Sequence, residues 1–183
     1  MGFDRQPHLT GELLDARPLA AADFDGLYAA ASDPLTWEQH PDKTRHTPEG
    51  FGRWFDDALA SGGALTVRDR ADGDRIIGSS RYHGYDEPRS EVEIGWTFLA
   101  RTHWGGGYNR ELKRLMLEHA FAAVANVIFV VDRHNLRSRR AVEKLGARYV
   151  ESRAGERGPA NVVYLLAAAD WLRSAPSSAS GHR

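Results

Sequence analysis

The chain contains no cysteine. Disulfide bonds, thiolate metal ligands and a catalytic thiol are therefore excluded, and any chemistry must use other groups. Long apolar runs are also missing, since no stretch approaches the roughly 18 residues of a membrane-spanning helix. The first ten residues include Asp4 and Pro7 and lack the apolar segment of a secretion signal. We therefore expect a cytoplasmic location and no membrane partner.

Neither sign of charge is in excess. Twenty-four Lys and Arg residues face 25 Asp and Glu residues, for a net charge of -1. A dedicated nucleic-acid binder carries a strong positive field, so no nucleic-acid partner is expected. The eight histidines are scattered and show no His-x-x-x-His spacing. The sequence therefore predicts no metal site.

The composition is that of a globular protein. Of 183 residues, 42% are hydrophobic and 27% charged, and this length buries a substantial core without disulfide or metal support. We see no second hydrophobic unit behind a linker. The prediction is one domain over residues 1–173 and a disordered tail over residues 174–183, which are rich in Ser, Pro and Gly.

Hydrophobic periodicity predicts seven strands and four helices. The strands are expected at 13–19, 64–68, 75–82, 92–99, 127–131, 148–152 and 162–167, and the helices at 20–31, 47–59, 107–124 and 138–145. This order favours an α/β sandwich with a mixed, mostly antiparallel sheet. Strand alternation puts Glu93 opposite Val92, Ile94 and Trp96. On the longest helix, Lys113 falls mostly with the polar residues, away from the apolar side.

Three consecutive glycines join the strand at 92–99 to the longest helix. Gly105, Gly106 and Gly107 allow close backbone approach, and the free N–H groups and dipole of a helix start favour a phosphate or pyrophosphate. For the glycines by themselves, a tight turn is the alternative. Tyr108-Asn109 stands where a P-loop has Lys and Ser or Thr, and a dinucleotide fold has its glycine loop after the first strand. Both nucleotide folds are therefore poor fits.

The residues around these glycines resemble the GNAT acetyltransferase superfamily. Its signature is Gln/Arg-x-x-Gly-x-Gly/Ala, and residues 104–109 occupy that frame with different first and last residues. The runs 104–111 and 135–147, the second with Asn-x-x-Ser and Glu-Lys-x-Gly, look like the ribosomal-protein N-terminal acetyltransferases of the RimJ and RimL type. The resemblance covers about residues 13–171. It implies a GNAT-type sandwich and acetyl-coenzyme A (acetyl-CoA) as co-substrate.

The resemblance also implies a donor site. In the family, strand backbone holds the pantetheine arm, the glycine loop holds the pyrophosphate, and the Asn-x-x-Ser helix borders the thioester. Carried over to this chain, these roles fall on Thr97, Phe98, Leu99, Trp104, Gly105, Gly106, Gly107, Tyr108, Asn109, Asn135 and Ser138.

Two proton-transfer roles follow from the same resemblance. Glu93 precedes Trp104 by the spacing of the family's general base, with a surface or structural carboxylate as the alternative. Many members use a tyrosine to protonate the departing thiolate, but Val142 stands at that position. Ser138 matches a serine proposed for this task in the RimL-like branch, and a helix cap is its alternative role.

The predicted reaction is acetyl transfer to a primary amine by direct attack in a ternary complex, with a protein N-terminus as a candidate acceptor. The alternatives are a small amine such as an antibiotic or polyamine, or an acyl-CoA-binding sensor without turnover. The oligomeric state is left open, with a homodimer among the options. The substrate-side candidates are Trp37, His40, Arg45 and Tyr82, together with Tyr85 and Trp54, whose spacing also suits a core residue.

Overall fold

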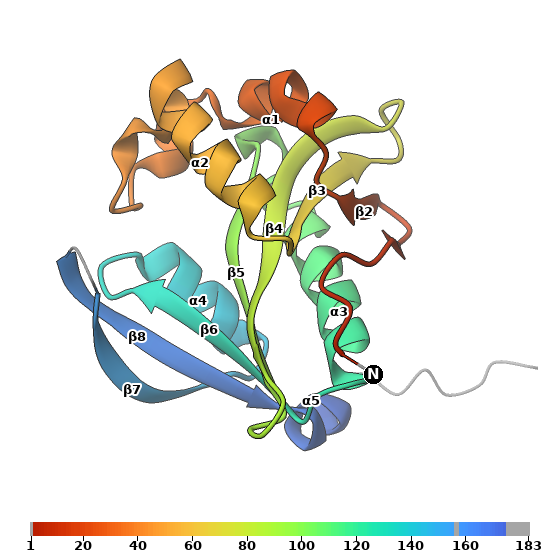
Figure 1. Cartoon of the computed structure of the whole chain (residues 1–183), viewed down its shortest axis with the longest axis vertical. Helices are drawn as coiled ribbons and strands as arrows, with labels where there is room; N and C mark the ends of the chain where they lie inside the picture. The colour runs from red at the N-terminus through yellow and green to blue at the C-terminus, as the bar shows by residue number, and fades with distance from the viewer. Residues whose placement is uncertain (1, 156–157, 175–183) are drawn as a thin grey trace, which may run out of the picture.

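The computed structural model describes residues 2–155 and 158–174. Within this part of the chain, one mixed sheet of eight strands has the order β1-β2-β3-β4-β5-β6-β8-β7 (Figure 1). The strands are β1 (Leu9–Thr10), β2 (Leu14–Pro18), β3 (Ala64–Asp69), β4 (Arg75–Asp86), β5 (Glu91–Leu99), β6 (Asn126–Asp132), β7 (Arg148–Gly155) and β8 (Gly158–Ala167). The fold class predicted from the sequence, an α/β sandwich of the GNAT type, is confirmed.

Five α-helices and four short 3-10 helices join the strands in the described residues. They are η1 (Ala21–Asp23), α1 (Phe24–Ala31), η2 (Pro34–Trp37), η3 (Lys43–His46), α2 (Pro48–Ala60), η4 (Arg101–His103), α3 (Tyr108–Phe121), α4 (Leu136–Lys144) and α5 (Ala168–Ser174). β1 and α5 were not predicted, and the expected loop at 32–47 contains η2 and η3. The predicted tail began at Ser174, which belongs to α5, and residues 175–183 lie outside the described part.

Helix boundaries follow from local capping. Thr47 accepts a hydrogen bond from Gly50 N–H, and Pro48 occupies the first position of α2, where its missing N–H costs nothing. At α4 the cap is Asn135, whose Oδ1 accepts a bond from Ser138 N–H at 3.1 Å. Ser138 therefore lies in the first turn of α4, and the prediction that it caps the helix is wrong.

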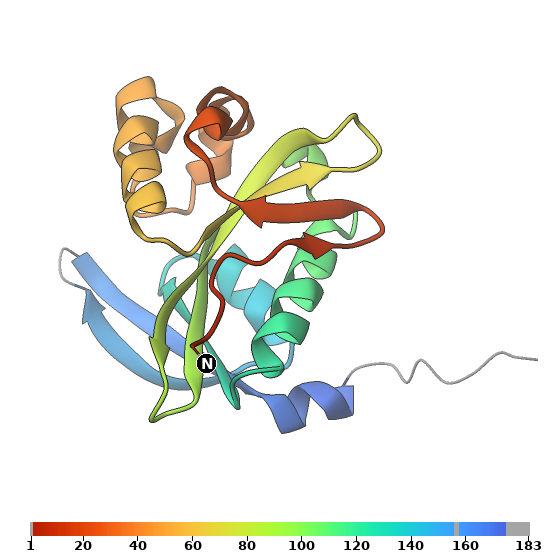
Figure 2. The same ribbon diagram turned by 45° about the vertical axis from the view of Figure 1, so that its right-hand side comes forward.

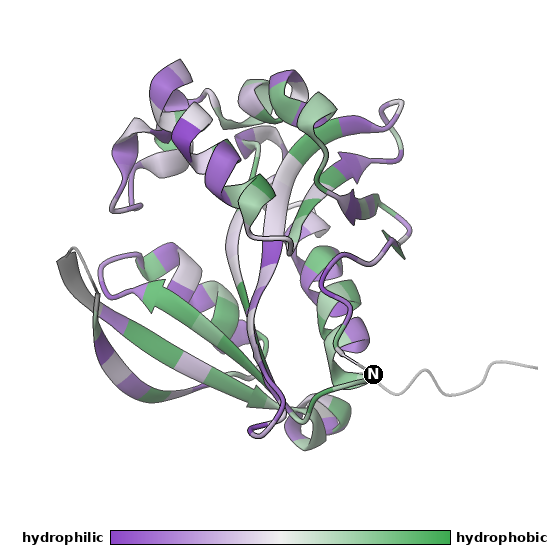
Figure 3. Cartoon of the chain, viewed as in Figure 1, coloured by the Kyte–Doolittle hydropathy of each residue, from purple (hydrophilic) through white to green (hydrophobic). Residues whose placement is uncertain are grey.

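The helices pack on two faces of the sheet around separate cores. Figures 1 and 2 show α1 and α2 together on one side and α3 on the other. The larger core joins α3 to β2–β6, with Met116, Ile94 and Phe129 among its buried residues. The smaller core is mainly aromatic and joins α1 and α2 to Phe98 of β5. Figure 3 shows that β6 and β8 are mainly hydrophobic, as buried strands require.

A β-bulge in β5 changes which residues face which core. Trp96 has a φ of +51°, and the β4–β5 register shifts between Ser79 and Arg81. The Trp96 ring lies 5.1 Å from His83, which pairs with Glu93 in register, whereas Thr97 turns toward α3. Trp96 therefore shares the face of Glu93, and the alternation that put them on opposite faces is wrong.

β5 and β6 are the one parallel pair in the described sheet. They pair at only three positions, which end at Glu93 and Ile128, and then diverge (Figure 1). On its other edge, β6 pairs with β8 over its whole length, from Asn126 to Asp132. The two parallel strands thus form a V. On the edges that face each other, their residues beyond Glu93 and Ile128 have no strand pairing.

Candidate active site

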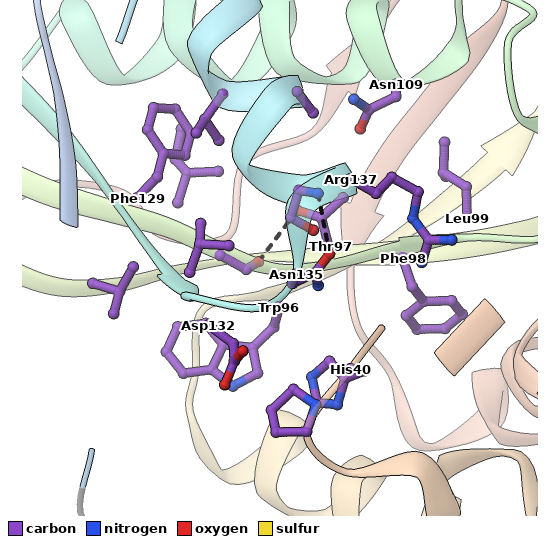
Figure 4. A pocket seen from close by; sticks show the side chains of 18 of the residues that line it. His40, Trp96, Thr97, Phe98, Leu99, Asn109, Phe129, Asp132, Asn135 and Arg137 are labelled. Carbon is purple, nitrogen blue, oxygen red and sulfur yellow. Dashed lines mark hydrogen bonds between the residues drawn. The ribbon is translucent and has the colours of Figure 1, made fainter. Parts of the chain in front are cut away.

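A cavity of about 900 Å³ opens inside this V (Figure 4). β5 forms one wall and β6 the other. The η4–α3 junction, the start of α4 and the segment 36–45 form further parts of the wall. We call this space the β5–β6 cavity. It brings together most of the residues that the sequence marked as functional, although they come from four separate segments: 37–45, β5, the η4–α3 junction and the start of α4.

Eight of the predicted donor-site residues line the β5–β6 cavity. They are Thr97, Phe98, Leu99, Trp104, Gly105, Asn109, Asn135 and Ser138. Gly106, Gly107 and Tyr108 are not among the lining residues. The Tyr108 hydroxyl instead donates to Asp69 at 3.1 Å, so the side chain points toward β3 and away from the cavity. Any contribution of Tyr108 to donor binding must come from its backbone.

The glycine junction has the conformation that its sequence requires. Gly105 and Gly107 have φ values of +77° and +90°, in the left-handed region that favours glycine. Gly107 is also the N-cap residue of α3, and without a side chain it cannot cap the free N–H groups of the first turn. These N–H groups and the positive end of the helix dipole form a site for an anionic group.

A buried polar cluster behind the junction holds it against β3. Asp69 Oδ2 lies 3.1 Å from both His103 Nε2 and the Tyr108 hydroxyl, and the His103 and Tyr108 rings meet edge to face at 4.9 Å. Although burial favours the protonated form, hydrogen bonds from Ala71 N–H, His103 and Tyr108 keep the Asp69 pKa below its usual value. Sequence reasoning missed Asp69, because nothing local links residue 69 to the glycines.

Arg137 connects the start of α4 with two other walls of the cavity. Its guanidinium lies 4.1 Å from the centroid of the Trp104 ring, and Nη2 donates to the Thr36 carbonyl at 2.9 Å. Trp104 in turn donates from Nε1 to the Leu99 carbonyl. This chain of contacts fixes α4 relative to β5 and the glycine junction. Arg137 was also missed from the sequence, although it lies within the Asn-x-x-Ser motif.

Glu93 lies at the base of the V, in the last register pair before β5 and β6 diverge. Its side chain is half-buried, and burial raises its pKa to about 7 against the opposing charges of Arg153 and Arg81. A carboxylate that titrates near neutral pH and borders a cavity has the properties of a general base. The geometry therefore favours the base interpretation of Glu93 over that of a surface carboxylate.

Three of the four substrate-side candidates also line the cavity: Trp37, His40 and Arg45. The Arg45 guanidinium lies 5.5 Å from the Trp37 ring centroid. Burial, together with the charge of Arg45, lowers the pKa of His40 to about 4, so the ring is neutral at pH 7. His40 Nδ1 lies 2.9 Å from Asp42 N and 3.0 Å from the Asp42 carbonyl oxygen, so the backbone of Asp42 holds the ring in place.

Tyr82 is the candidate that the structure corrects. It is 0% exposed, belongs to the larger core and donates its hydroxyl proton to the Met116 carbonyl at 2.7 Å. It does not line the β5–β6 cavity, because the strand alternation of β4 turns it toward α3. Trp54 is buried in the smaller core, and Tyr85 stacks on Phe3.

Lys113 is a second correction. The helical pattern placed it with the polar side of α3, but it is only 6% exposed and lines the cavity. The signal was present in the sequence, since Lys113 follows Asn109 by four residues and precedes Met116 by three, so it shares their stripe. Val142, at the position of the family's tyrosine, is buried and also lines the cavity.

Metal sites and membrane-spanning helices are two further features to consider. In residues 2–155 and 158–174, no three His, Cys, Asp or Glu side chains are grouped so that they could hold a metal ion. None of the helices in that part of the chain is long and apolar enough to cross a membrane.

Comparisons with known proteins agree with this geometry. A curated relative, the uncharacterized protein YkkB of Bacillus subtilis, is 37% identical over 65 residues, which are 34% of this chain and 37% of YkkB. A GCN5-related N-acetyltransferase from Brucella melitensis has a TM-score of 0.81 at 19% identity, over 91% of this chain and 81% of that one. RimJ of Mycobacterium smegmatis, solved with CoA-disulfide, has a TM-score of 0.65 at 17% identity, over 85% of this chain and 82% of RimJ.

These two structures share the fold. The family itself follows from a sequence model, described as an acetyltransferase (GNAT) domain, that matches residues 14–148. That range contains the glycine junction, Glu93, the Asn-x-x-Ser motif and all the cavity walls except the end of β7 and the start of β8. The chain therefore belongs to the GNAT acetyltransferase family.

Proposed function

We propose that this protein transfers the acetyl group of acetyl-CoA to a primary amine, by direct attack within a ternary complex. The observation that carries the proposal is the continuity of the β5–β6 cavity. One end is a glycine junction with an uncapped helix start, and Glu93 lies where the two parallel strands separate. A donor with an anionic head and an acyl tip fits such a space.

The donor is proposed to lie along β5. The N–H groups at Gly105 to Asn109 would hold the pyrophosphate, and the backbone at Thr97 to Leu99 would hold the pantetheine arm. β5 has no β6 partner beyond Glu93, so its backbone groups from Ile94 onward are available on that edge. The start of α4, with Asn135 and Ser138, would border the thioester.

Glu93 is proposed as the group that accepts the amine proton. Attack requires a neutral amine, and a carboxylate with a pKa of about 7 is in its basic form in half of the molecules at pH 7. Placing the amine and thioester side by side contributes further, since well-oriented groups gain several kcal/mol over reaction in solution. The proposed step needs no metal ion, nucleic acid or membrane, and suits the cytoplasm.

A protein N-terminus is the acceptor that we favour. At pH 7.4 roughly a quarter of an α-amine is neutral, against about a thousandth of a lysine side chain. The RimJ-like motifs and the fold shared with RimJ support the same class of acceptor. A small amine such as an antibiotic or polyamine remains the second candidate. We also propose that residues 1–173 form one catalytic domain, with a homodimer as an option.

A thiol-release assay tests the proposal. The purified chain is mixed with acetyl-CoA and, separately, with peptides that have free N-termini, polyamines and aminoglycosides. Turnover that is highest on peptides supports a protein N-terminus as the acceptor. Turnover that is highest on a polyamine or aminoglycoside would make a small amine the acceptor instead. Binding of acetyl-CoA by calorimetry without turnover on any amine would support the acyl-CoA-binding sensor instead.

A further inference from the structure

A buried lysine lies in the wall of the β5–β6 cavity without an anionic partner. Lys113 Nζ donates to Thr97 Oγ1 at 2.5 Å, lies 3.5 Å from Ser80 Oγ, and is 6.0 Å from the centroid of the Phe129 ring. No carboxylate forms an ion pair with it among residues 2–155 and 158–174. A buried ammonium group without a counter-ion is costly, so a structural role by itself does not explain this residue.

The groups that face Lys113 are neutral. β4 contributes Ser80, β5 contributes Thr97 and β6 contributes Phe129. Burial is the cause that lowers its pKa to about 7, from a usual value of 10.5. The charged or titratable groups elsewhere in the cavity wall are His40, Arg45, His83, Glu93, His103, Asp132, Arg137 and Arg153.

Lys113 and Glu93 approach the cavity from opposite faces of the sheet. Glu93 shares its face with His83 and Trp96, toward α2, whereas Lys113 rises from α3 and reaches Thr97 on the other side of the bulge. The V between β5 and β6 passes through the sheet, so both side chains line the same space. Glu93 and Lys113 therefore reach this space from opposite sides of the sheet.

The reaction needs an acid at this place. When the C–S bond breaks, the sulfur leaves as a thiolate, and the position that holds a tyrosine in many family members is Val142. Besides Ser138, which also lines the cavity, the wall near Thr97 offers the Lys113 ammonium group.

We propose that Lys113 donates a proton to the sulfur of the departing coenzyme A, directly or through the Thr97 hydroxyl. This inference rests on the proposed acetyl transfer. The amine nitrogen bonds to the acetyl carbon, the C–S bond breaks, and its electron pair goes to sulfur, which takes the Nζ proton. Glu93 takes the amine proton. Solvent then reprotonates Lys113 and deprotonates Glu93, so the cycle closes without another reactant.

The pKa values of Glu93 and Lys113 predict how the rate depends on pH. Glu93 must be ionised and Lys113 protonated, and with both pKa values at about 7, roughly a quarter of the molecules at pH 7 carry this combination. The rate should therefore follow a bell-shaped curve with its maximum near neutral pH. Its acidic limb belongs to Glu93 and its alkaline limb to Lys113.

The test compares Lys113→Met with wild type and with Arg114→Met. Met matches the length of Lys and suits the apolar wall, and Arg114 is the neighbouring residue of α3, 43% exposed, so it controls for loss of a cation on the same helix. At saturating acetyl-CoA and pH 7, Lys113→Met should lower kcat on the order of a hundredfold and remove the alkaline limb. Arg114→Met should keep both limbs and the wild-type kcat.

A readout without turnover uses coenzyme A alone. The thiol of bound coenzyme A is titrated by the ultraviolet absorbance of its thiolate, with a reference pKa of about 8.5 for a free thiol. Beside the Lys113 ammonium the bound thiol should titrate lower in wild type than in Lys113→Met, while Arg114→Met should match wild type. If coenzyme A does not bind at all, the proposed function fails before Lys113 is in question.

Several results would overturn the role of Lys113. They are an unchanged kcat in Lys113→Met, an alkaline limb that persists there, or a bound thiol that titrates identically in both proteins. A rise in the Kd for coenzyme A as large as the fall in kcat would make Lys113 a binding residue. Acetylated Lys113, found by mass spectrometry after incubation with acetyl-CoA, would make it a nucleophile.

Discussion

The two ends of the β5–β6 cavity are built in different ways. The proposed donor end comes from two continuous runs, 97–109 and 135–142, and its main features are backbone conformations: the left-handed glycines, the start of α3 and the cap at Asn135. The proposed acceptor end combines side chains from the segment 36–45, from β4 and β5, and from β6 to β8. Short-range sequence patterns therefore describe the donor end far better than the acceptor end.

The two ends also differ in their dependence on pH. Helix dipoles and backbone N–H groups do not titrate, so phosphate binding at the glycine junction should change little between pH 6 and 9. At the acceptor end, burial raises the pKa of Glu93 to about 7 and lowers that of His40 to about 4. Substitutions at the two ends should therefore separate donor affinity from the pH dependence of the rate.

The largest effect is expected for Gly106→Glu at the donor end. Gly106 does not have a positive φ, and an added Cβ would meet only the Tyr108 ring, at 3.5 and 3.7 Å. The backbone should tolerate the change, while the carboxylate places a like charge beside the pyrophosphate. We expect the Kd for acetyl-CoA, measured by calorimetry, to rise more than about a hundredfold, with a melting temperature within a few degrees of wild type.

Gly106→Ala is the matched control, since it adds the Cβ without the charge, and it should bind nearly as wild type does. Wild-type affinity in the Glu variant would show that the phosphates lie elsewhere and that the backbone description of the donor end is wrong.

Glu93→Gln should have the next largest effect, on rate and not on donor binding. The amide keeps the shape and cannot accept the proton, so kcat at pH 7 should fall by about a hundredfold with an unchanged Kd for acetyl-CoA. Because the raised pKa of Glu93 keeps it largely protonated below about pH 7, the wild-type rate should climb as the pH rises toward 7, and the variant should lose this acidic limb.

The Glu93→Gln defect should also be larger for a lysine-like amine than for an N-terminal amine, which has a sizeable neutral fraction near pH 7. Rates from pH 6 to 9.5 on both acceptors would show this difference. An equal defect at every pH, on both amines, would mean that Glu93 positions the strand or substrate and is not the base.

A smaller, acceptor-specific effect is expected for Arg45→Gln. The charge of Arg45 helps to lower the His40 pKa, so its removal should move that pKa upward from about 4, although burial still holds it below the usual value. We expect the acceptor KM to rise about tenfold, in line with the loss of one charged interaction. Histidine NMR titration and steady-state kinetics measure the two changes. A parallel tenfold loss of donor affinity would show that the two ends are not independent.

The last expected effect concerns stability and not the rate. The folded-state pKa of Lys113 is lowered, so the unfolded chain binds more protons between about pH 7 and 10.5, and the free energy of unfolding should rise with pH in that window. At one pKa unit per about 1.4 kcal/mol, the gain reaches several kcal/mol at most. Lys113→Met should lack this rise and be the more stable protein at pH 7. Urea unfolding of both proteins at pH 7 and 9.5 measures this rise. If the free energy of unfolding changed with pH equally in wild type and Lys113→Met, the lowered pKa of Lys113 would be contradicted.

The predictions that failed depended on how the side chains face after folding. Trp96 was placed by regular strand alternation, and a bulge moved it to the face of Glu93. Tyr82 was placed by the resemblance of its hairpin to the acceptor side of the family, and the regular part of β4 turned it into the core. The pairing of β8 between β6 and β7 is likewise not a local property, because it depends on which strand edge is free after folding. Lys113 was assigned to solvent because of its charge, although its helical position pointed inward.

The sequence by itself determined the order and type of the main elements, the glycine junction, the family resemblance and the candidate base. These features depend on residues close together in the chain, where periodicity, capping and backbone freedom act. Only the tertiary structure decided that Asp69 anchors the junction, that Arg137 joins three walls, and that Lys113 shares a cavity with Glu93. Those relations depend on burial and on contacts between distant segments, and the pKa values that give Glu93 and Lys113 their proposed roles exist only once the chain has removed both from water.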